Sequence, residues 1–176
     1  WGEGFCLLND QAIAANYLLD SNLAQRILII DLDVHQGNGT AEIFQNDDRV
    51  FTFSMHGDKN FPFRKEQSSL DVPLDDGISD DVYLEKLAHF LPVIFELHQP
   101  DFVFYLAGVD VLATDKLGKL SLTQEGCGHR DELVLNFCKS KMVPLQVSMG
   151  GGYSHHIKDI VDAHCNTFKL ARNIFF

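Results

Sequence analysis

Paired cysteines, long apolar runs and basic clusters are missing from this chain of 176 residues, and each absence excludes a class of protein. The four cysteines are widely spaced without a Cys-x-x-Cys pair, which argues against a disulfide framework and a thiolate zinc site and favours reduced core thiols. No apolar run approaches the ~20 residues of a membrane span, and no signal segment opens the chain. We therefore expect a cytoplasmic protein that makes no membrane contact.

The charge is strongly acidic, with a formal net charge of −11 and basic residues that are scattered along the chain instead of clustered. A nucleic-acid surface needs a basic patch or stripe, so direct nucleic-acid binding is not expected. An acidic surface would suit cationic substrates such as lysine-bearing tails or polyamines, although solubility explains it equally well. The length and the 45% share of hydrophobic residues are those of one globular domain.

A buried strand that ends in charged side chains is the centre of the sequence. Four consecutive aliphatic residues, 27–30, are followed by Asp31, Asp33 and His35. If the extended conformation persists, these three side chains project to one side of the strand. Two carboxylates and an imidazole suit Zn²⁺ or another divalent transition metal, with a further ligand from elsewhere. The alternative is an ordinary helix cap followed by a turn.

Strands and helices alternate along the rest of the chain, and no two strands have hairpin spacing. This order predicts an α/β fold with a parallel sheet flanked by helices on both faces. The apolar strand before Asp110 ends in acid, like the first one, and the last strand runs into three glycines and Tyr153. The expected strands cover 27–33, 50–55, 101–110 and 143–149. The expected helices cover 11–19, 40–45, 80–98, 123–140 and 155–172.

Several local features are predicted to be structural. Residues 68–80 are polar and read as turns, and Pro92 should kink or offset the long helix. His89 and His98 have no acidic or metal-spaced neighbour on that helix, so both are expected at the surface. The loop 115–122 is assigned to packing.

Five motifs in the same order resemble those of the histone deacetylase family, in the broad sense that includes bacterial acetoin-utilisation proteins and acetylpolyamine amidohydrolases. The string 31–39 resembles the family's Asp-x-Asp-x-His-x-Gly-Asn/Asp-Gly motif. The other four are a Gly-Phe-Cys-x-x-Asn-Asp segment from Gly4, Phe-Pro at Phe61, Ala-Gly-x-Asp ending at Asp110 and Gly-Gly-Gly-Tyr ending at Tyr153. The resemblance covers essentially the whole chain and implies an arginase/deacetylase-like fold.

The resemblance also implies a catalytic site. A divalent metal, zinc or another transition metal, would be held by Asp33, His35 and Asp110, with an open position for water or substrate. Tyr153 would stabilise the oxyanion. The other implied catalytic residues are Asp31, which accepts a hydrogen bond from a catalytic histidine in the family, and Asn38, which orients a second histidine.

Substrate and monovalent-cation sites are implied in the same way. Phe5 and Phe61 would enclose the methylene stem of an acylated lysine or polyamine, with Phe63 as a less secure choice for the second wall, and Gly4 and Gly151 complete the substrate-binding set. A potassium-like site is implied at Asp31, Asp33, His35, Ser54 and Met55. A weaker cation site is implied at Phe44, Asp47 and Val50.

One departure concerns the general base. The family's paired histidines precede the Gly-Phe-Cys segment and have no counterpart here, while His155 and His156 follow Tyr153 and are not expected to replace them. We therefore expect residues 1–176 to be the C-terminal portion of a single deacetylase domain, lacking its N-terminal portion. Such a piece should be a poor enzyme alone and should self-associate or hold an upstream fragment.

The leading hypothesis is a zinc-dependent hydrolase that removes acetyl or other acyl groups from lysine or polyamine amines. A non-catalytic metal-binding or interaction fragment is the alternative. An arginase-type enzyme would need more aspartates and histidines for a second metal.

Overall fold

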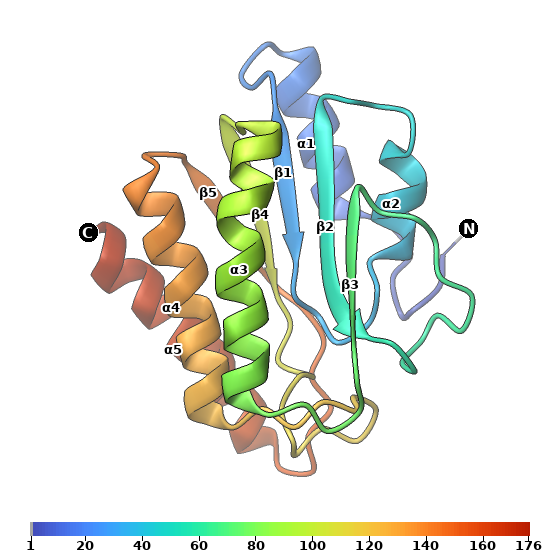
Figure 1. Ribbon diagram of the computed structural model, residues 1–176, viewed down its shortest axis with the longest axis vertical. Coiled ribbons are helices and arrows are strands. Elements are labelled where there is room, and N and C mark those ends of the chain that lie inside the picture. The colour runs from blue at the N-terminus through green and yellow to red at the C-terminus, as the bar shows by residue number, and fades with distance from the viewer. Residues whose placement is uncertain (1) are drawn as a thin grey trace.

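The computed structural model describes residues 2–176 as one sheet of five strands with five helices (Figure 1). The strands are β1 (Ile27–Asp31), β2 (Val50–Gly57), β3 (Leu70–Leu74), β4 (Phe102–Ala107) and β5 (Leu145–Met149). The helices are α1 (Asp10–Asp20), α2 (Asn38–Phe44), α3 (Asp80–His98), α4 (Gln124–Ser140) and α5 (Ile157–Phe175).

The sheet has the strand order β3-β2-β1-β4-β5, and every neighbouring pair is parallel. The predicted fold class is therefore confirmed. From β1 the chain moves outward through β2 and β3, and it then returns to place β4 on the opposite side of β1. Open α/β sheets bind ligands where the strand order reverses in this way, outside the carboxyl ends of the strands. The reversal here lies between β1 and β4.

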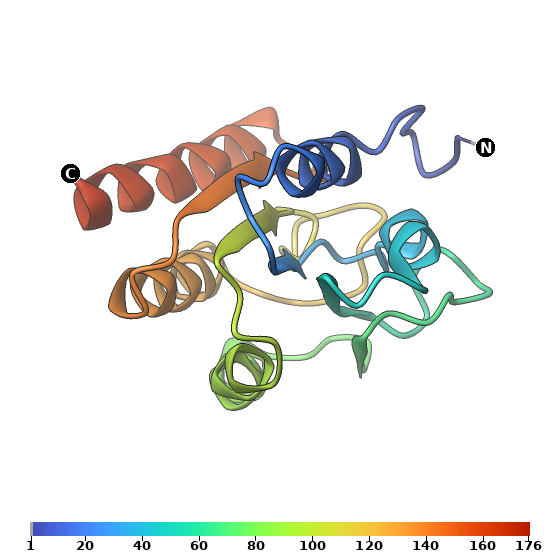
Figure 2. The ribbon, with the colours of Figure 1, turned by 90° about the horizontal axis from the view of Figure 1, so that it is seen from above.

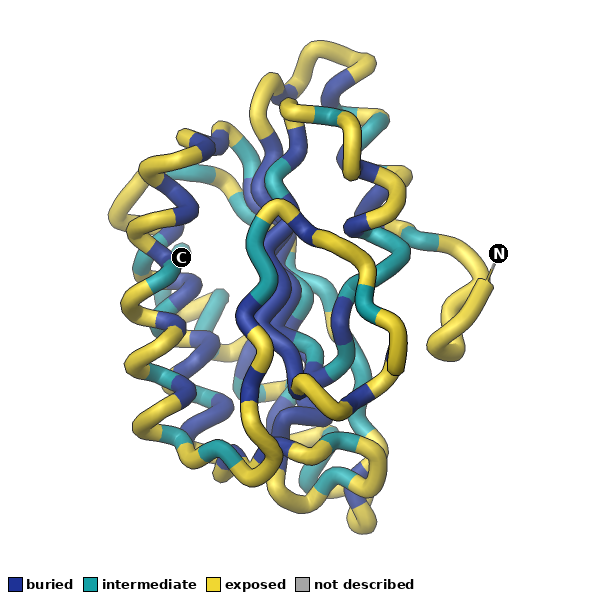
Figure 3. The backbone as a smooth tube through the Cα atoms, turned by 45° about the vertical axis from the view of Figure 1, so that its right-hand side comes forward, coloured by how far each residue is buried: buried dark blue, intermediate teal, exposed yellow. Residues whose placement is uncertain are grey.

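Two hydrophobic clusters cover the two faces of the sheet, because strand side chains alternate in direction. Leu28 and Ile30 of β1 belong to the larger cluster, which includes buried residues of α3 and α4. Ile27 and Ile29 belong to the smaller cluster under α1. Figure 2 shows α1 on the side of the sheet opposite to α3, and Figure 3 shows the central strands as the buried interior.

Helices α1 and α4 begin with side-chain caps. The Asn9 side chain accepts a hydrogen bond from the Ala12 amide, and the Thr123 hydroxyl accepts one from the Gly126 amide. Both bonds satisfy amide groups that have no partner inside the helix. Helix α3 continues through Pro92 and ends at Gln99, whose backbone is left-handed.

Two predictions for residues 68–98 were wrong. Strand β3 lies within residues 68–80, where we expected only turns. Its alternating Val72 and Leu74 are buried, while Pro73 lies exposed on an edge strand, where a missing amide costs no ladder hydrogen bond. His98 is buried rather than at the surface, with its ring centroid 5.5 Å from that of Phe51.

The exposed residues of the structure bear on the predictions for the cysteines, the membrane and self-association. All four cysteines are free, but Cys6 and Cys165 are exposed, so only the other two are core thiols. In residues 2–176 no helix has the length and apolarity needed to cross a bilayer. Apolar side chains such as Met149, Ile157 and Val161 are exposed along β5 and α5. Self-association through such surfaces stays a prediction.

Candidate metal centre

The chain leaves the sheet at Asp31 and is held in two successive side-chain turns. Asp31 Oδ1 accepts a hydrogen bond from the Asp33 amide at 3.0 Å, and Asp33 Oδ1 accepts one from the His35 amide at 2.9 Å. Aspartate side chains favour such turns because they bond the backbone two residues further on. The expectation that the strand extends to Asp33 was therefore wrong, and the side chains of Asp33 and His35 are positioned by these turns instead.

Segments from β4 and β5 close on this turn. Asp110 Oδ1 accepts a hydrogen bond from the Val34 amide at 2.9 Å, and Asp33 Oδ2 accepts one from the Gly151 amide at 2.8 Å. The Val109 amide in turn donates to the Gly151 carbonyl at 2.8 Å. Three segments that are distant in the sequence are thus fixed at the carboxyl edge of the sheet.

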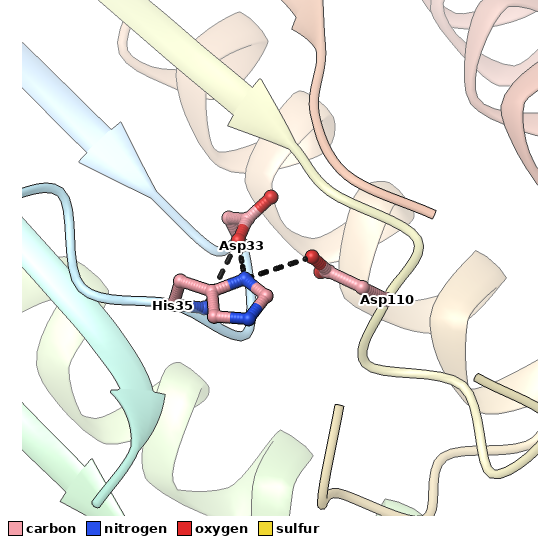
Figure 4. A group of neighbouring side chains, drawn as sticks. All are labelled: Asp33, His35 and Asp110. Carbon is pink, nitrogen blue, oxygen red and sulfur yellow. Dashed lines mark hydrogen bonds and ion pairs between the residues drawn. The ribbon is translucent and has the colours of Figure 1, made fainter. Parts of the chain in front are cut away.

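Asp33, His35 and Asp110 come together at this edge (Figure 4). His35 Nδ1 lies 3.0 Å from Asp33 Oδ1 and 3.2 Å from Asp110 Oδ2. One ligand atom from each residue lies within 4.8 Å of the others. The side chain of Asp110 is 1% exposed and that of His35 is 27% exposed, so the group is buried on one side and open on the other.

The electrostatics of the group reflect two carboxylates in one buried place. Burial, followed by the charge of Asp33, raises the pKa of Asp110 to about 7. Burial alone would lower the pKa of His35, but its contacts with Asp110 and Asp33 outweigh this and raise the pKa to about 10. Burial and the charge of Asp33 also raise the pKa of Asp31 well above its ordinary value.

The donor set fits a divalent cation. Asp110 Oδ2 is buried, and its ion-pair contact with His35 Nδ1 at 3.2 Å lacks hydrogen-bond geometry. A buried carboxylate oxygen without a hydrogen bond is costly. A metal ion would satisfy this oxygen and would replace the proton that His35 holds between the two carboxylates. One imidazole and two carboxylates are ligands that Zn²⁺ and similar ions accept, and three protein ligands leave a position for water or substrate.

Gly151 lies against the two carboxylates without room for a side chain. An ideal Cβ on Gly151 would lie 2.2 Å from Asp110 Oδ2 and 3.0 Å from Asp33 Oδ2. Glycine permits this close backbone approach because it has no Cβ. Its proposed contact with substrate stays a prediction.

The aromatic residues predicted to bind substrate lie near one another. The ring centroids of Phe5 and Tyr153 are 5.6 Å apart, and an added Cβ on Gly4 would lie 3.6 Å from the Phe61 ring. Phe5 is 85% exposed and Tyr153 is 43% exposed, so both rings reach solvent. Phe63, the second choice for a wall, is almost fully exposed.

Asp115 has a role that the sequence interpretation missed, because we assigned its loop to packing. Its Oδ2 accepts a hydrogen bond from the Tyr153 amide at 2.6 Å, while its Oδ1 accepts bonds from the amides of Leu117 and Gly118. Asp115 therefore fixes the backbone that presents Tyr153. Only the side-chain turn motif Asp-x-Leu-Gly was available as a signal, and it does not reveal a partner 38 residues away.

The remaining predicted residues have local polar partners. Asp31 is paired in register with Ser54, whose hydroxyl lies 2.9 Å from His56 Nδ1, and Met55 follows in β2. The Asn38 side chain donates a hydrogen bond to Glu3. The proposed cation site at these strands stays a prediction, as does the weaker one, where the Phe44 and Asp47 carbonyls accept hydrogen bonds from the amides of Asp47 and Val50.

The two histidines after Tyr153 are separate from the group. His155 and His156 are exposed, and neither ring hydrogen-bonds to Asp33, His35 or Asp110. Within residues 2–176, no second histidine hydrogen-bonds to the trio.

Comparison with known proteins gives a consistent family. The family model described as "Histone deacetylase domain" matches residues 2–168. An uncharacterised protein from Picosynechococcus sp. is 50% identical over 99% of this chain and 58% of its own length. Histone deacetylase 2 from Arabidopsis thaliana is 36% identical over 86% of this chain and 40% of its own length.

The fold gives the same result. The crystal structure of a histone deacetylase homologue from Aquifex aeolicus superposes with a TM-score of 0.83 at 27% sequence identity, covering 97% of this chain and 48% of that one. The chain thus spans about half the length of the relatives and solved structures that it matches.

Proposed function

Because this chain belongs to the histone deacetylase family, we propose that the protein is a metal-dependent amide hydrolase that removes acyl groups from the amines of lysine side chains or polyamines. The observation that carries the metal-dependent part is the buried Asp110 Oδ2, which lies 3.2 Å from His35 Nδ1 but makes no hydrogen bond. Zinc is the proposed metal, with Asp33, His35 and Asp110 as its ligands. When bound, the metal would polarise the amide carbonyl and lower the pKa of bound water.

Residues around the metal ligands are assigned to substrate and transition state. Tyr153, which reaches solvent, is proposed to donate a hydrogen bond from its hydroxyl to the carbonyl oxygen as this oxygen becomes negatively charged. Phe5, whose ring lies beside that of Tyr153, and Phe61, which lies close to Gly4, enclose the methylene stem of the acylated amine and exclude water from it. The acidic net charge favours the approach of a cationic peptide or polyamine.

Proton transfer is assigned to none of the described histidines. His35 is proposed as a metal ligand, and the rings of His155 and His156 do not contact the trio by hydrogen bonds. A metal-binding module without catalysis is therefore a second candidate. The experiment described next separates it from the hydrolase.

The experiment uses the full-length protein and an acetyl-lysine peptide. We expect deacetylation that is lost on chelation and restored by Zn²⁺. The variant Asp110→Ala should lose both bound metal and activity, while Asp162→Ala, which changes an exposed carboxylate on α5, should keep both. Metal retention without activity would support the non-catalytic module, and equal metal content in both variants would contradict the ligand assignment. Acetylpolyamine as a competing substrate identifies the preferred amine.

A further inference from the structure

Arg130 and Asp131 form an ion pair in the hydrophobic core, on the buried face of α4. Their side chains are 0% and 1% exposed, and the proposed chemistry uses neither of them. Burying two charges is costly unless their polar atoms are satisfied by specific partners. The partners of this pair therefore indicate its role.

The Arg130 guanidinium joins the backbones of two ligand-bearing segments. Its Nη1 donates hydrogen bonds to the Gly108 carbonyl at 2.5 Å and to the Leu32 carbonyl at 3.3 Å. Leu32 directly precedes Asp33, and Gly108 lies two residues before Asp110. Arg130 Nη1 thus bridges the backbone segment that carries Asp33 and the segment that carries Asp110.

Asp131 holds the guanidinium in this position. Its Oδ1 accepts hydrogen bonds from Arg130 Nε at 2.9 Å and Nη2 at 2.7 Å, and a third from the Tyr105 hydroxyl at 2.5 Å. Its Oδ2 accepts a bond from the Thr167 hydroxyl of α5 at 2.6 Å. Since Tyr105 belongs to β4, the network connects the centre of the sheet with α4 and α5.

The geometry calls for arginine specifically. The guanidinium is a planar fork whose separate N–H groups can bond a carboxylate on one edge and carbonyls on another. A lysine ammonium would keep the charge but has one nitrogen atom on a flexible stem, so it cannot hold Asp131 and both carbonyls in the same arrangement. A pair that served only to fill the core would not need contacts to these two carbonyls.

We propose that Arg130, oriented by Asp131, is a positioning residue that sets the separation of Asp33 and Asp110 and so tunes metal affinity. This inference rests on the proposed function, because it assumes that the two aspartates hold the metal. Outer partners that orient metal ligands typically change metal affinity about 10- to 100-fold when they are removed.

The test measures metal affinity in the full-length protein by competition between Zn²⁺ and a chelator. We expect Arg130→Lys and Arg130→Met to weaken Zn²⁺ binding at least ~10-fold. Leu87→Ala is the matched control, because it opens a cavity in the same hydrophobic cluster but removes no polar contact of the network. It should lower stability while Zn²⁺ affinity stays unchanged. The absorption spectrum of bound Co²⁺, which reports ligand geometry, should change only in the Arg130 variants.

Two outcomes separate this inference from the proposed function. Wild-type protein that binds no Zn²⁺ would refute the proposed function. Folded Arg130 variants with wild-type affinity and an unchanged Co²⁺ spectrum would overturn the positioning role alone. If neither Arg130 variant folds, Thr167→Val decides, because it removes one hydroxyl that holds Asp131 and leaves Arg130 in place. An affinity below that of wild type supports the proposal, and an equal affinity overturns it.

Discussion

Replacing Gly151 by alanine should damage the candidate metal centre through one methyl group. The added Cβ would lie 2.2 Å from Asp110 Oδ2, whereas an ordinary contact is about 3.5 to 4 Å. Either the carboxylate or the glycine backbone must therefore move by about 1 Å. Moving the carboxylate displaces a proposed metal ligand, and moving the backbone breaks its hydrogen bonds with Asp33 and Val109.

Moving the carboxylate and moving the backbone cost similar free energies and have the same functional result. Loss of two hydrogen bonds costs about 2 kcal/mol, and overpacking a tight site costs about 1 to 3 kcal/mol. We therefore expect the free energy of unfolding to fall by about 2 kcal/mol. Because either route disturbs the carboxylates, Zn²⁺ affinity should fall about 10- to 100-fold.

Denaturant unfolding and Zn²⁺ competition with a chelator measure the two effects. Gly39→Ala is the matched control: it lies in α2, and its added Cβ would have nothing closer than the Asn9 side chain at 4.0 Å. That variant should be neutral or more stable by about 0.5 to 1 kcal/mol, because glycine weakens a helix. If Gly151→Ala unfolds at the same denaturant concentration as wild type and binds Zn²⁺ equally well, the close approach at Gly151 is wrong.

Three further predictions concern Tyr153, Asp115 and the proton on His35. Tyr153→Phe should lower the turnover number about 10²- to 10³-fold with unchanged metal content, and an unchanged turnover number would show that another group stabilises the oxyanion. Asp115→Ala should also lower the turnover number without loss of metal, because Asp115 holds the Tyr153 backbone. It should therefore have little further effect in a Tyr153→Phe background. Additive losses in the double variant would exclude this link. Metal binding must displace the proton from His35, because the pKa of His35 is raised to about 10 in the metal-free protein. Zn²⁺ affinity should therefore increase about tenfold per pH unit from pH 7 to 8. Below pH 7 the increase should be steeper, because Asp110 also releases a proton there. An affinity that levels off above pH 7 would indicate an ordinary histidine.

Local signals in the sequence predicted four of the five strands, the five helices and the identity of the chemical groups. Apolar runs predicted β1 and β4, because strands buried on both faces are apolar throughout. Asn9 and Thr123 are residues of the types that cap helices, and their side chains satisfy free amides at the starts of α1 and α4. The short edge strand β3 was missed, since only Val72 and Leu74 carry its buried pattern among polar residues and a proline.

Tertiary structure alone decided which groups meet. No spacing in the sequence relates Asp115 to Tyr153, or Arg130 to the carbonyls of Leu32 and Gly108, because these contacts join segments that the chain brings together only on folding. The sequence by itself determined that carboxylates follow two buried strands, and a packed core does not accommodate carboxylates without partners. That Asp110 lies beside Asp33 and His35 follows from the reversal of strand order between β1 and β4, which is set by how the helices cover both faces of the sheet.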